Sequence, residues 1–208
     1  MNIFNNHKNK DSRIFQKFLL KDGEVWYMPD FMPAHKTGEY FNKLLKSINW
    51  KQEEIKMYGK TYPVPRQTAW YGYEGFNYSY SGIQCNPEPW TQELLDIKKV
   101  IEHFLPEQDF NSVLLNLYRN GNDKVSWHAD DEKELGKNPV IASVSLGASR
   151  RFDLKHKNDK TEKLQLELLT GSLIVMLGEL QHNWLHQIPA QKKINQPRIN
   201  LTYRTIKT

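Results

Sequence analysis

Residues 198–204 read Arg-Ile-Asn-Leu-Thr-Tyr-Arg. Successive side chains of a β-strand point to opposite faces, so this stretch has two unlike faces. The polar face would consist of Arg198, Asn200, Thr202 and Arg204, and the apolar face of Ile199, Leu201 and Tyr203. If the polar face lines the inside of a barrel, its two arginines require a bound anion, and a dicarboxylate suits them because arginine binds carboxylate in a bidentate way. Taken alone, such a strand more often has its arginines in solvent and its apolar face on the core.

Other short runs rich in Val, Ile and Leu precede this strand, with turn signals between them. They cover residues 112–119, 140–146, 152–156, 163–168 and 172–177. No helix-length pattern separates them, which favours a sandwich or barrel over a parallel sheet. In the first half of the chain, apolar residues at helical spacing predict two amphipathic helices, over residues 36–50 and 90–105. Between them, residues 58–82 are dense in Tyr, Gly and Pro and predict hairpins and loops.

Length and composition exclude several classes of protein. A chain of 208 residues is long enough for one domain with a real core. It has no apolar run near 18 residues and no apolar segment in its polar first 13 residues, which predicts neither a membrane-spanning helix nor a secretory signal. Its one cysteine, Cys85, rules out a disulfide framework and a cysteine-rich zinc site. We therefore expect a cytoplasmic protein.

The charge of the chain is basic and unevenly placed. The net charge is +5, and the last 23 residues contain five basic residues and no acidic one. Aromatic residues make up 12% of the chain. A basic, aromatic-rich chain suggests a polyanionic partner such as nucleic acid.

Three residues of the second half suggest a metal site. His128 and Asp130 are two residues apart and would share one side of a strand, and His186 follows 56 residues later. Two histidines and one carboxylate on a β scaffold form the facial triad of non-haem Fe(II) oxygenases. His156 and His182 compete for the place of the third ligand. Taken alone, the tripeptide 128–130 is more simply interpreted as a solvated histidine beside an acidic run. The strand with two arginines favours the interpretation as a metal site.

Together these motifs resemble the AlkB family of Fe(II)/2-oxoglutarate dioxygenases, most closely the branch that repairs alkylated bases in duplex DNA. The resemblance extends from about Met57 to Thr208. It is carried by His128-x-Asp130, His186, Arg198-x5-Arg204 and Asn116-x-Tyr118, and by the segments Val-Pro-Arg-Gln (64–67), Tyr-Ser-Tyr-Ser-Gly (78–82), Ile-Ala-Ser-Val-Ser-Leu-Gly-Ala (141–148) and Pro-Arg-Ile-Asn-Leu-Thr-Tyr-Arg (197–204).

The resemblance implies a mainly β fold with flanking helices and a jelly-roll (double-stranded β-helix) core. We expect an N-terminal arm over residues 1–22, helices and a nucleotide-recognition lid over 23–105, and the catalytic core over 106–208, all within one compact monomer. His128, Asp130 and His186 would bind Fe(II). The 2-oxoglutarate would be held by Asn116, Tyr118, Arg198, Asn200, Thr202 and Arg204, with Arg198 on its distal carboxylate.

The implied reaction is oxidative demethylation of N-alkylated bases such as N1-methyladenine and N3-methylcytosine. Dioxygen and 2-oxoglutarate would be consumed, and succinate, carbon dioxide and formaldehyde released. The base must leave the helical stack to reach a buried iron.

The resemblance also assigns residues to the substrate. Met57, Tyr58 and Gly59 would form a wedge at the tip of a hairpin. Tyr78 and Tyr80 would stack on the base, with Arg66 near it, and Asp131 and Glu132 would favour the positive charge of the base. Lys192 and Lys193 would contact phosphates. The same chemistry on RNA or on a protein side chain, and a nucleic-acid binder without catalysis, stay open as alternatives.

Overall fold

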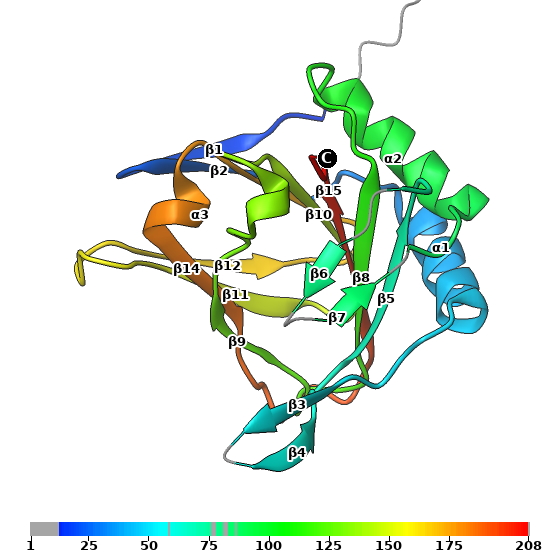
Figure 1. The fold of residues 1–208 in the computed structure, drawn as a ribbon. Coiled ribbons are helices and arrows are strands. Elements are labelled where there is room, and N and C mark those ends of the chain that lie inside the picture. Colours follow the sequence, from blue (N-terminus) through cyan, green and yellow to red (C-terminus); the bar gives the residue numbers. More distant parts are fainter. Residues whose placement is uncertain (1–12, 58, 76–77, 81–82, 86, 208) are drawn as a thin grey trace, which may run out of the picture.

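The computed structural model describes residues 13–57, 59–75, 78–80, 83–85 and 87–207, without the side chains of 56–57, 78–80 and 83–85. Two antiparallel sheets face each other in it (Figure 1). The large sheet has the spatial order β1 (Gln16–Leu20), β2 (Gly23–Met28), β13 (Leu173–Leu177), β10 (Ile141–Gly147), β15 (Arg198–Arg204), β8 (Ser112–Tyr118) and β5 (Gln67–Gly72). The small sheet has the order β12 (Lys163–Leu168), β11 (Arg150–His156), β14 (Trp184–Ile188) and β9 (Val125–His128).

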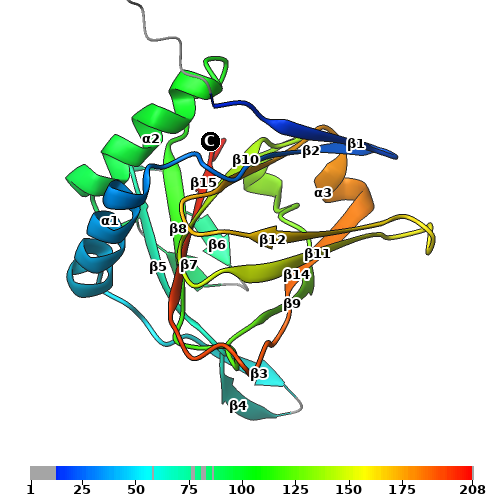
Figure 2. The same cartoon turned by 180° about the vertical axis from the view of Figure 1, so that it is seen from behind.

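This arrangement confirms the prediction of a mainly β jelly-roll core with flanking helices. The helices α1 (Ala34–Ser47) and α2 (Gln92–Phe104) lie side by side against the large sheet, on the side away from the small sheet (Figure 2). Helix α2 begins after Thr91, whose side chain accepts a hydrogen bond from the backbone of Leu94, and it ends just before Pro106. The ends of both helices lie within three residues of those predicted from apolar spacing.

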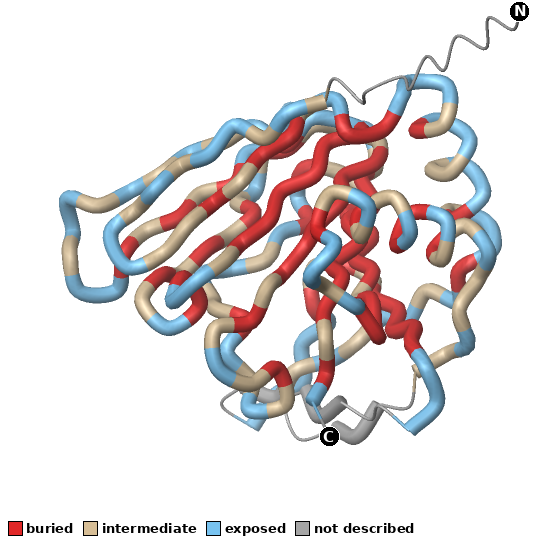
Figure 3. Tube along the Cα trace, turned by 90° about the horizontal axis from the view of Figure 1, so that it is seen from above, coloured by how far each residue is buried: buried red, intermediate tan, exposed pale blue. Residues whose placement is uncertain are grey.

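Two apolar cores result from this layering. One lies between the helices and the large sheet and contains Leu44, Ile97, Ile199, Leu201 and Tyr203. The other lies between the two sheets and contains Tyr118, Ile174, Met176, Phe152 and Trp184. Strand β15 separates them and is buried along its whole length. Figure 3 shows this buried zone running along the central strands, with exposure concentrated in the outer loops.

The hairpin predicted around Gly59 is present. Strand β3 (Glu54–Met57) pairs with β4 (Lys60–Pro63), and Gly59 has a φ of 75°, which a residue without Cβ adopts freely. A second small hairpin joins β6 (Tyr78–Tyr80) to β7 (Ile83–Cys85).

The predicted boundaries at residues 22 and 105 do not separate structural units. Residues 16–20 form β1, an edge strand paired with β2, so position 22 lies inside a β-hairpin; residues 1–12 lie outside the described range. The large sheet also mixes β2 and β5 from the first half of the chain with strands from the second half. Within the described residues, no helix has both the length and the apolar character needed to span a bilayer.

Candidate metal and cosubstrate site

The three predicted metal ligands meet between the two sheets. Strand pairing sets His128 of β9 opposite His186 of β14, and the centres of their rings are 4.2 Å apart. One ligand atom from each of His128, Asp130 and His186 lies within 4.8 Å of the others. Two imidazole nitrogens and a carboxylate oxygen at this spacing suit Fe(II). His156 and His182 are not part of this group.

The prediction that His128 and Asp130 share one strand is wrong. Strand β9 ends at His128, and Asp130 lies in the irregular segment that follows. Its carboxylate Oδ1 forms a buried ion pair with Arg204 Nη2 at 2.8 Å. Its backbone N–H donates to Oε1 of Gln181, a buried side chain of the short helix α3 (Leu180–Asn183), at 2.9 Å. The position of Asp130 is therefore set by tertiary contacts and not by the alternation of side chains along a strand.

Both buried ligands are in the protonation state that metal binding requires. Burial would raise the pKa of Asp130, but the positive charge of Arg204, together with the two histidines, lowers it to about 2. Burial and the neighbouring His128 lower the pKa of His186 to about 3. At neutral pH the carboxylate is therefore ionised and the His186 imidazole is neutral, as a metal ligand must be.

The depressed pKa of His186 predicts a loss of stability in mild acid. Below its usual pKa of 6.5, the unfolded chain binds a proton at this histidine that the folded chain does not bind until about pH 3. The free energy of unfolding of the metal-free protein should therefore fall by roughly 2 kcal/mol from this group between pH 7.5 and 5.0. Asp130 acts in a lower window, because its stabilisation is present above its usual pKa of 3.8 and is lost as the pH falls towards 2.

Urea unfolding in the presence of EDTA at pH 7.5 and 5.0 checks this. The His186→Gln variant should lose that share of the pH dependence, whereas His182→Gln, an exposed histidine of α3, should keep it. Equal pH dependence in the wild type and His186→Gln would contradict the burial argument.

The polar face of β15 points into the space between the sheets. Asn200, Thr202 and Arg204 line the cavity that also holds the three metal ligands. The apolar face packs under the helices, so the arrangement with exposed arginines is excluded. Strand β15 pairs with β8 so that Arg198 lies opposite Tyr118 and Asn200 opposite Asn116. This register places the six predicted 2-oxoglutarate residues on two neighbouring strands, and all of them except Arg198 line the cavity.

Arg198 has the features of a receptor for a carboxylate. It is fully buried, and its Nη2 donates to Ser145 Oγ at 2.9 Å and to Asn200 Oδ1 at 2.8 Å. Its Nε and Nη1 are buried without a hydrogen-bond acceptor in the described part of the chain. Burial, with the nearby positive charge of Arg150, lowers its pKa to about 10, so it is still a cation at neutral pH. A buried cation with two unused donors fits an anionic cosubstrate.

The cavity that holds the three metal ligands has an empty volume of about 810 Å³, its open mouth included. Apolar side chains from both sheets line it beside the polar groups; they are Leu114, Val125, Phe152, Leu168, Ile174, Met176 and Ile188. Arg66 and Glu132 also line it, and Arg66 Nε donates to Asn116 Oδ1 at 2.7 Å. These two predicted substrate residues therefore share the cavity with the metal and cosubstrate residues.

The other predicted substrate residues are only partly described. Asp131 is exposed and lies 3.5 Å from Lys157 Nζ, and Lys192 and Lys193 are exposed in the loop between β14 and β15. Gly59 lies at the turn of the β3–β4 hairpin, while Tyr58 lies outside the described residues. Met57, Tyr78 and Tyr80 are placed in strands, but their side chains are not described.

Sequence reasoning missed Gln181, Ser145 and Arg150. Gln181 supports Asp130 from 51 positions away, and Ser145 supports Arg198 from 53 positions away. No local pattern marks such contacts. The alternation of Ser143 and Ser145 with apolar residues in β10 is the one signal that could have suggested a polar inner face.

Comparisons with known proteins agree with this geometry. The model of the 2OG-Fe(II) oxygenase superfamily matches residues 24–204. The alpha-ketoglutarate-dependent dioxygenase alkB homolog 3 of Bos taurus is 41% identical over 88% of this chain and 66% of its own length. The DNA oxidative demethylase ALKBH2 of Mus musculus is 38% identical over 85% of this chain and 73% of its own length. The chain thus spans about 66% of the alkB homolog 3 sequences that it matches.

Solved structures support the fold. The structure of OsALKBH1 matches with a TM-score of 0.62 at 17% identity, covering 91% of this chain and all of that one. A prolyl hydroxylase from Trichoplax adhaerens matches with a TM-score of 0.58 at 10% identity, covering 86% of this chain and 83% of that one.

Proposed function

Because the chain belongs to the 2OG-Fe(II) oxygenase superfamily, we propose that it is an Fe(II)- and 2-oxoglutarate-dependent dioxygenase that demethylates N-alkylated bases in DNA. N1-methyladenine and N3-methylcytosine are its proposed lesions, and duplex DNA with the damaged base flipped out is its proposed substrate. The observation that carries the proposal is the single cavity that joins the His128, Asp130 and His186 cluster to the polar face of β15. The relatives named as a DNA oxidative demethylase support the choice of substrate class.

The side chains of the cavity have separate tasks in this reaction. His128, Asp130 and His186 would hold Fe(II), which when bound supplies the activation of dioxygen that couples 2-oxoglutarate decarboxylation to hydroxylation of the N-methyl group. Arg198 binds the distal carboxylate of 2-oxoglutarate through its two unused donors. Arg204 keeps Asp130 ionised by its ion pair at 2.8 Å.

The remaining lining selects the base. The apolar side chains exclude water from the reacting methyl group, which limits wasteful side reactions. Methylation at N1 of adenine or N3 of cytosine makes the base a cation, and the carboxylate of Glu132 in the cavity wall favours that charge. The hydroxylated methyl group then leaves as formaldehyde, which restores the base.

A direct assay tests the proposal. The protein is incubated with Fe(II), 2-oxoglutarate and an oligonucleotide that carries one N1-methyladenine, as duplex DNA, single-stranded DNA or RNA in parallel. Formaldehyde release and restored adenine are measured. We expect turnover on DNA. Turnover on RNA alone would show that RNA, and not DNA, is the substrate class, and no turnover on any of the three would refute the proposal.

Tyr58 is expected to matter for duplex DNA in particular. A wedge that fills the gap left by a flipped base is worth about 1–3 kcal/mol of stacking, so Tyr58→Ala should lower kcat/KM on the duplex roughly 5-fold or more and change single-strand turnover little. Tyr62→Ala, at an exposed position of strand β4 in the same hairpin, is the matched control. An equal loss on both substrates would remove the wedge role.

A further inference from the structure

The loop of residues 189–194, between β14 and β15, is here called the basic loop. Its Lys192 and Lys193 are exposed and form no ion pair in the described part of the chain. We propose that the neutral side chain of Gln191 and the buried side chain of Arg150 position this loop so that its lysines reach the phosphates of nucleic acid. The inference rests on the proposed function and adds two positioning residues to it.

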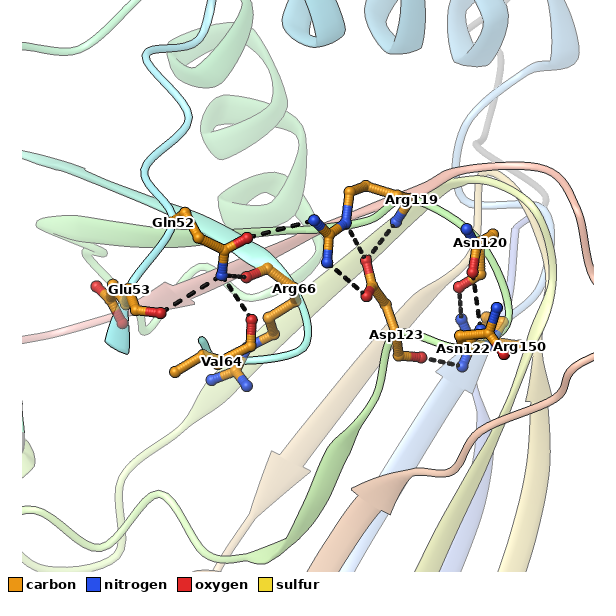
Figure 4. A network of polar contacts seen from close by, with 9 residues as sticks. All are labelled: Gln52, Glu53, Val64, Arg66, Arg119, Asn120, Asn122, Asp123 and Arg150. Atoms are coloured by element: carbon orange, nitrogen blue, oxygen red, sulfur yellow. Dashed lines mark hydrogen bonds and ion pairs between the residues drawn. The ribbon is translucent and has the colours of Figure 1, made fainter. Parts of the chain in front are cut away.

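Arg150 is a buried cation whose hydrogen bonds go to loop carbonyls. Only 1% of this residue is exposed. Its Nη2 donates to the backbone oxygens of Asp123 and Pro189, each at 2.8 Å, and its Nη1 donates to that of Asn120 at 3.3 Å. Arg150 therefore joins the loop after β8 to the basic loop, and Figure 4 shows the Asn120 and Asp123 side of this junction.

Gln191 is turned towards the protein instead of towards solvent. Its Oε1 accepts hydrogen bonds from Arg150 Nε at 3.3 Å and from the backbone N–H of Arg151 at 2.8 Å. The Gln191 amide therefore anchors the basic loop to strand β11.

Backbone hydrogen bonds hold the basic loop close to the loop after β8. The N–H of Gln191 donates to Gly121 O, and the N–H of Gly121 donates to Ile194 O, both at 2.7 Å. A Cβ atom on Gly121 would lie 1.9 Å from Gln191 O, so the approach of the loops requires glycine at this position. Substitution of Gly121 would therefore displace the basic loop.

The loop after β8 is also tied to the cavity. Arg119 forms a bidentate ion pair with Asp123, with two contacts of 2.8 Å, and its Nη1 reaches Gln52 Oε1 at 3.3 Å (Figure 4). Gln52 Nε2 in turn donates to the backbone oxygens of Val64 and Arg66 at 2.7 and 3.2 Å. Because Arg66 lines the cavity, one chain of contacts relates the basic loop to the place where the base would enter.

Salt dependence separates positioning from a merely structural role. Each lysine that neutralises a phosphate releases a counterion and steepens the fall of affinity with salt by about 0.9 in a log–log plot. Gln191 has no charge, so its removal can change this slope only through the lysines.

The experiment measures binding of the Mn(II)- and 2-oxoglutarate-loaded protein to a labelled duplex with one N1-methyladenine, over a series of salt concentrations. The proteins compared are the wild type, Gln191→Ala, the double variant Lys192→Gln with Lys193→Gln, and the triple variant. We expect Gln191→Ala to raise Kd roughly 10-fold at low salt and to flatten the slope by about 1–2. In the double-lysine background the same substitution should have no further effect.

Two more variants sharpen the result. Gly121→Ala should reproduce the effect of Gln191→Ala by moving the basic loop from its other side, provided that thermal unfolding shows the variant to be folded. Gln187→Ala is the matched control, because Gln187 Nε2 also bonds a residue of β11, Asp153, at 3.0 Å, but lies before the basic loop.

The outcomes are distinct. Three results would each overturn the positioning role while the proposed function stands. The first is wild-type affinity and salt slope in Gln191→Ala, and the second is a loss of affinity in Gln191→Ala that adds fully to the loss caused by the lysine substitutions. The third is an equal loss of affinity in Gln187→Ala. Absence of any nucleic-acid binding by the wild type would refute the proposed function and this inference with it.

Discussion

Replacing His186 by alanine is expected to abolish tight binding of a divalent metal and, with it, all turnover. The site offers three protein ligands, and His186 supplies one of them from a position that is 6% exposed. Loss of residues that merely support a metal ligand typically costs 10- to 100-fold in affinity, so loss of the ligand itself should weaken Mn(II) binding by roughly 100-fold or more. Titration calorimetry with Mn(II) measures this without any dependence on substrate.

His182→Ala is the control for this prediction. His182 lies four residues earlier, is exposed, and its Nε2 accepts a hydrogen bond from the backbone of Asn138 at 3.3 Å. It should leave the Mn(II) affinity unchanged within about twofold. Retained affinity in His186→Ala, or a comparable loss in His182→Ala, would show that the metal is bound elsewhere.

Replacing Arg198 by methionine is expected to raise the KM for 2-oxoglutarate by about 30-fold or more. Removing one partner of a buried charge-assisted contact costs about 2–5 kcal/mol, and every 1.4 kcal/mol is tenfold in affinity. Methionine fills much of the same space, so the adjoining Ser145 and Asn200 lose a donor without a large cavity forming. Metal affinity should change little, because Arg198 is not in the cluster of metal ligands.

Two comparisons make this prediction specific. Arg198→Lys keeps the charge but not the forked geometry, so its KM should lie between those of the wild type and Arg198→Met. Arg151→Met is the matched control, because Arg151 lies on the exposed side of β11 and pairs with Asp153 at 3.1 Å. A KM in Arg198→Met within twofold of the wild type would remove Arg198 from the cosubstrate site.

Much of the fold was predictable because its signals are local. The predicted strands over 163–168 and 198–204 coincide with β12 and β15, and both long helices appear near their predicted ends. The short strands β9 and β14 and the helix α3 were not predicted as runs. Strand β9 and helix α3 have four residues each, which is too few for a periodic pattern to stand out, and His186 and Gln187 interrupt the apolar residues of β14.

The metal ligands were also predictable, but for an incomplete reason. His128, Asp130 and His186 do converge, yet Asp130 lies beyond the end of β9. Its position depends on Arg204 and Gln181, which are far away in sequence and close only in the folded chain. The spacing His-x-Asp identified His128 and Asp130 through the resemblance. The contact that orients the Asp130 carboxylate is its ion pair with Arg204, which forms only in the folded chain.

The sequence by itself determined that residues 198–204 form a strand with one polar and one apolar face, because alternation in a strand follows from backbone geometry alone. Only the tertiary structure decided that both faces are buried, the polar one towards the metal ligands and the apolar one under the helices. The physical reason is that a buried guanidinium needs polar or anionic groups beside it, and only the folded chain brings such groups together. For Arg198 those groups come from β10 and β15 and leave two donors unused, and for Arg204 the partner is the carboxylate of Asp130.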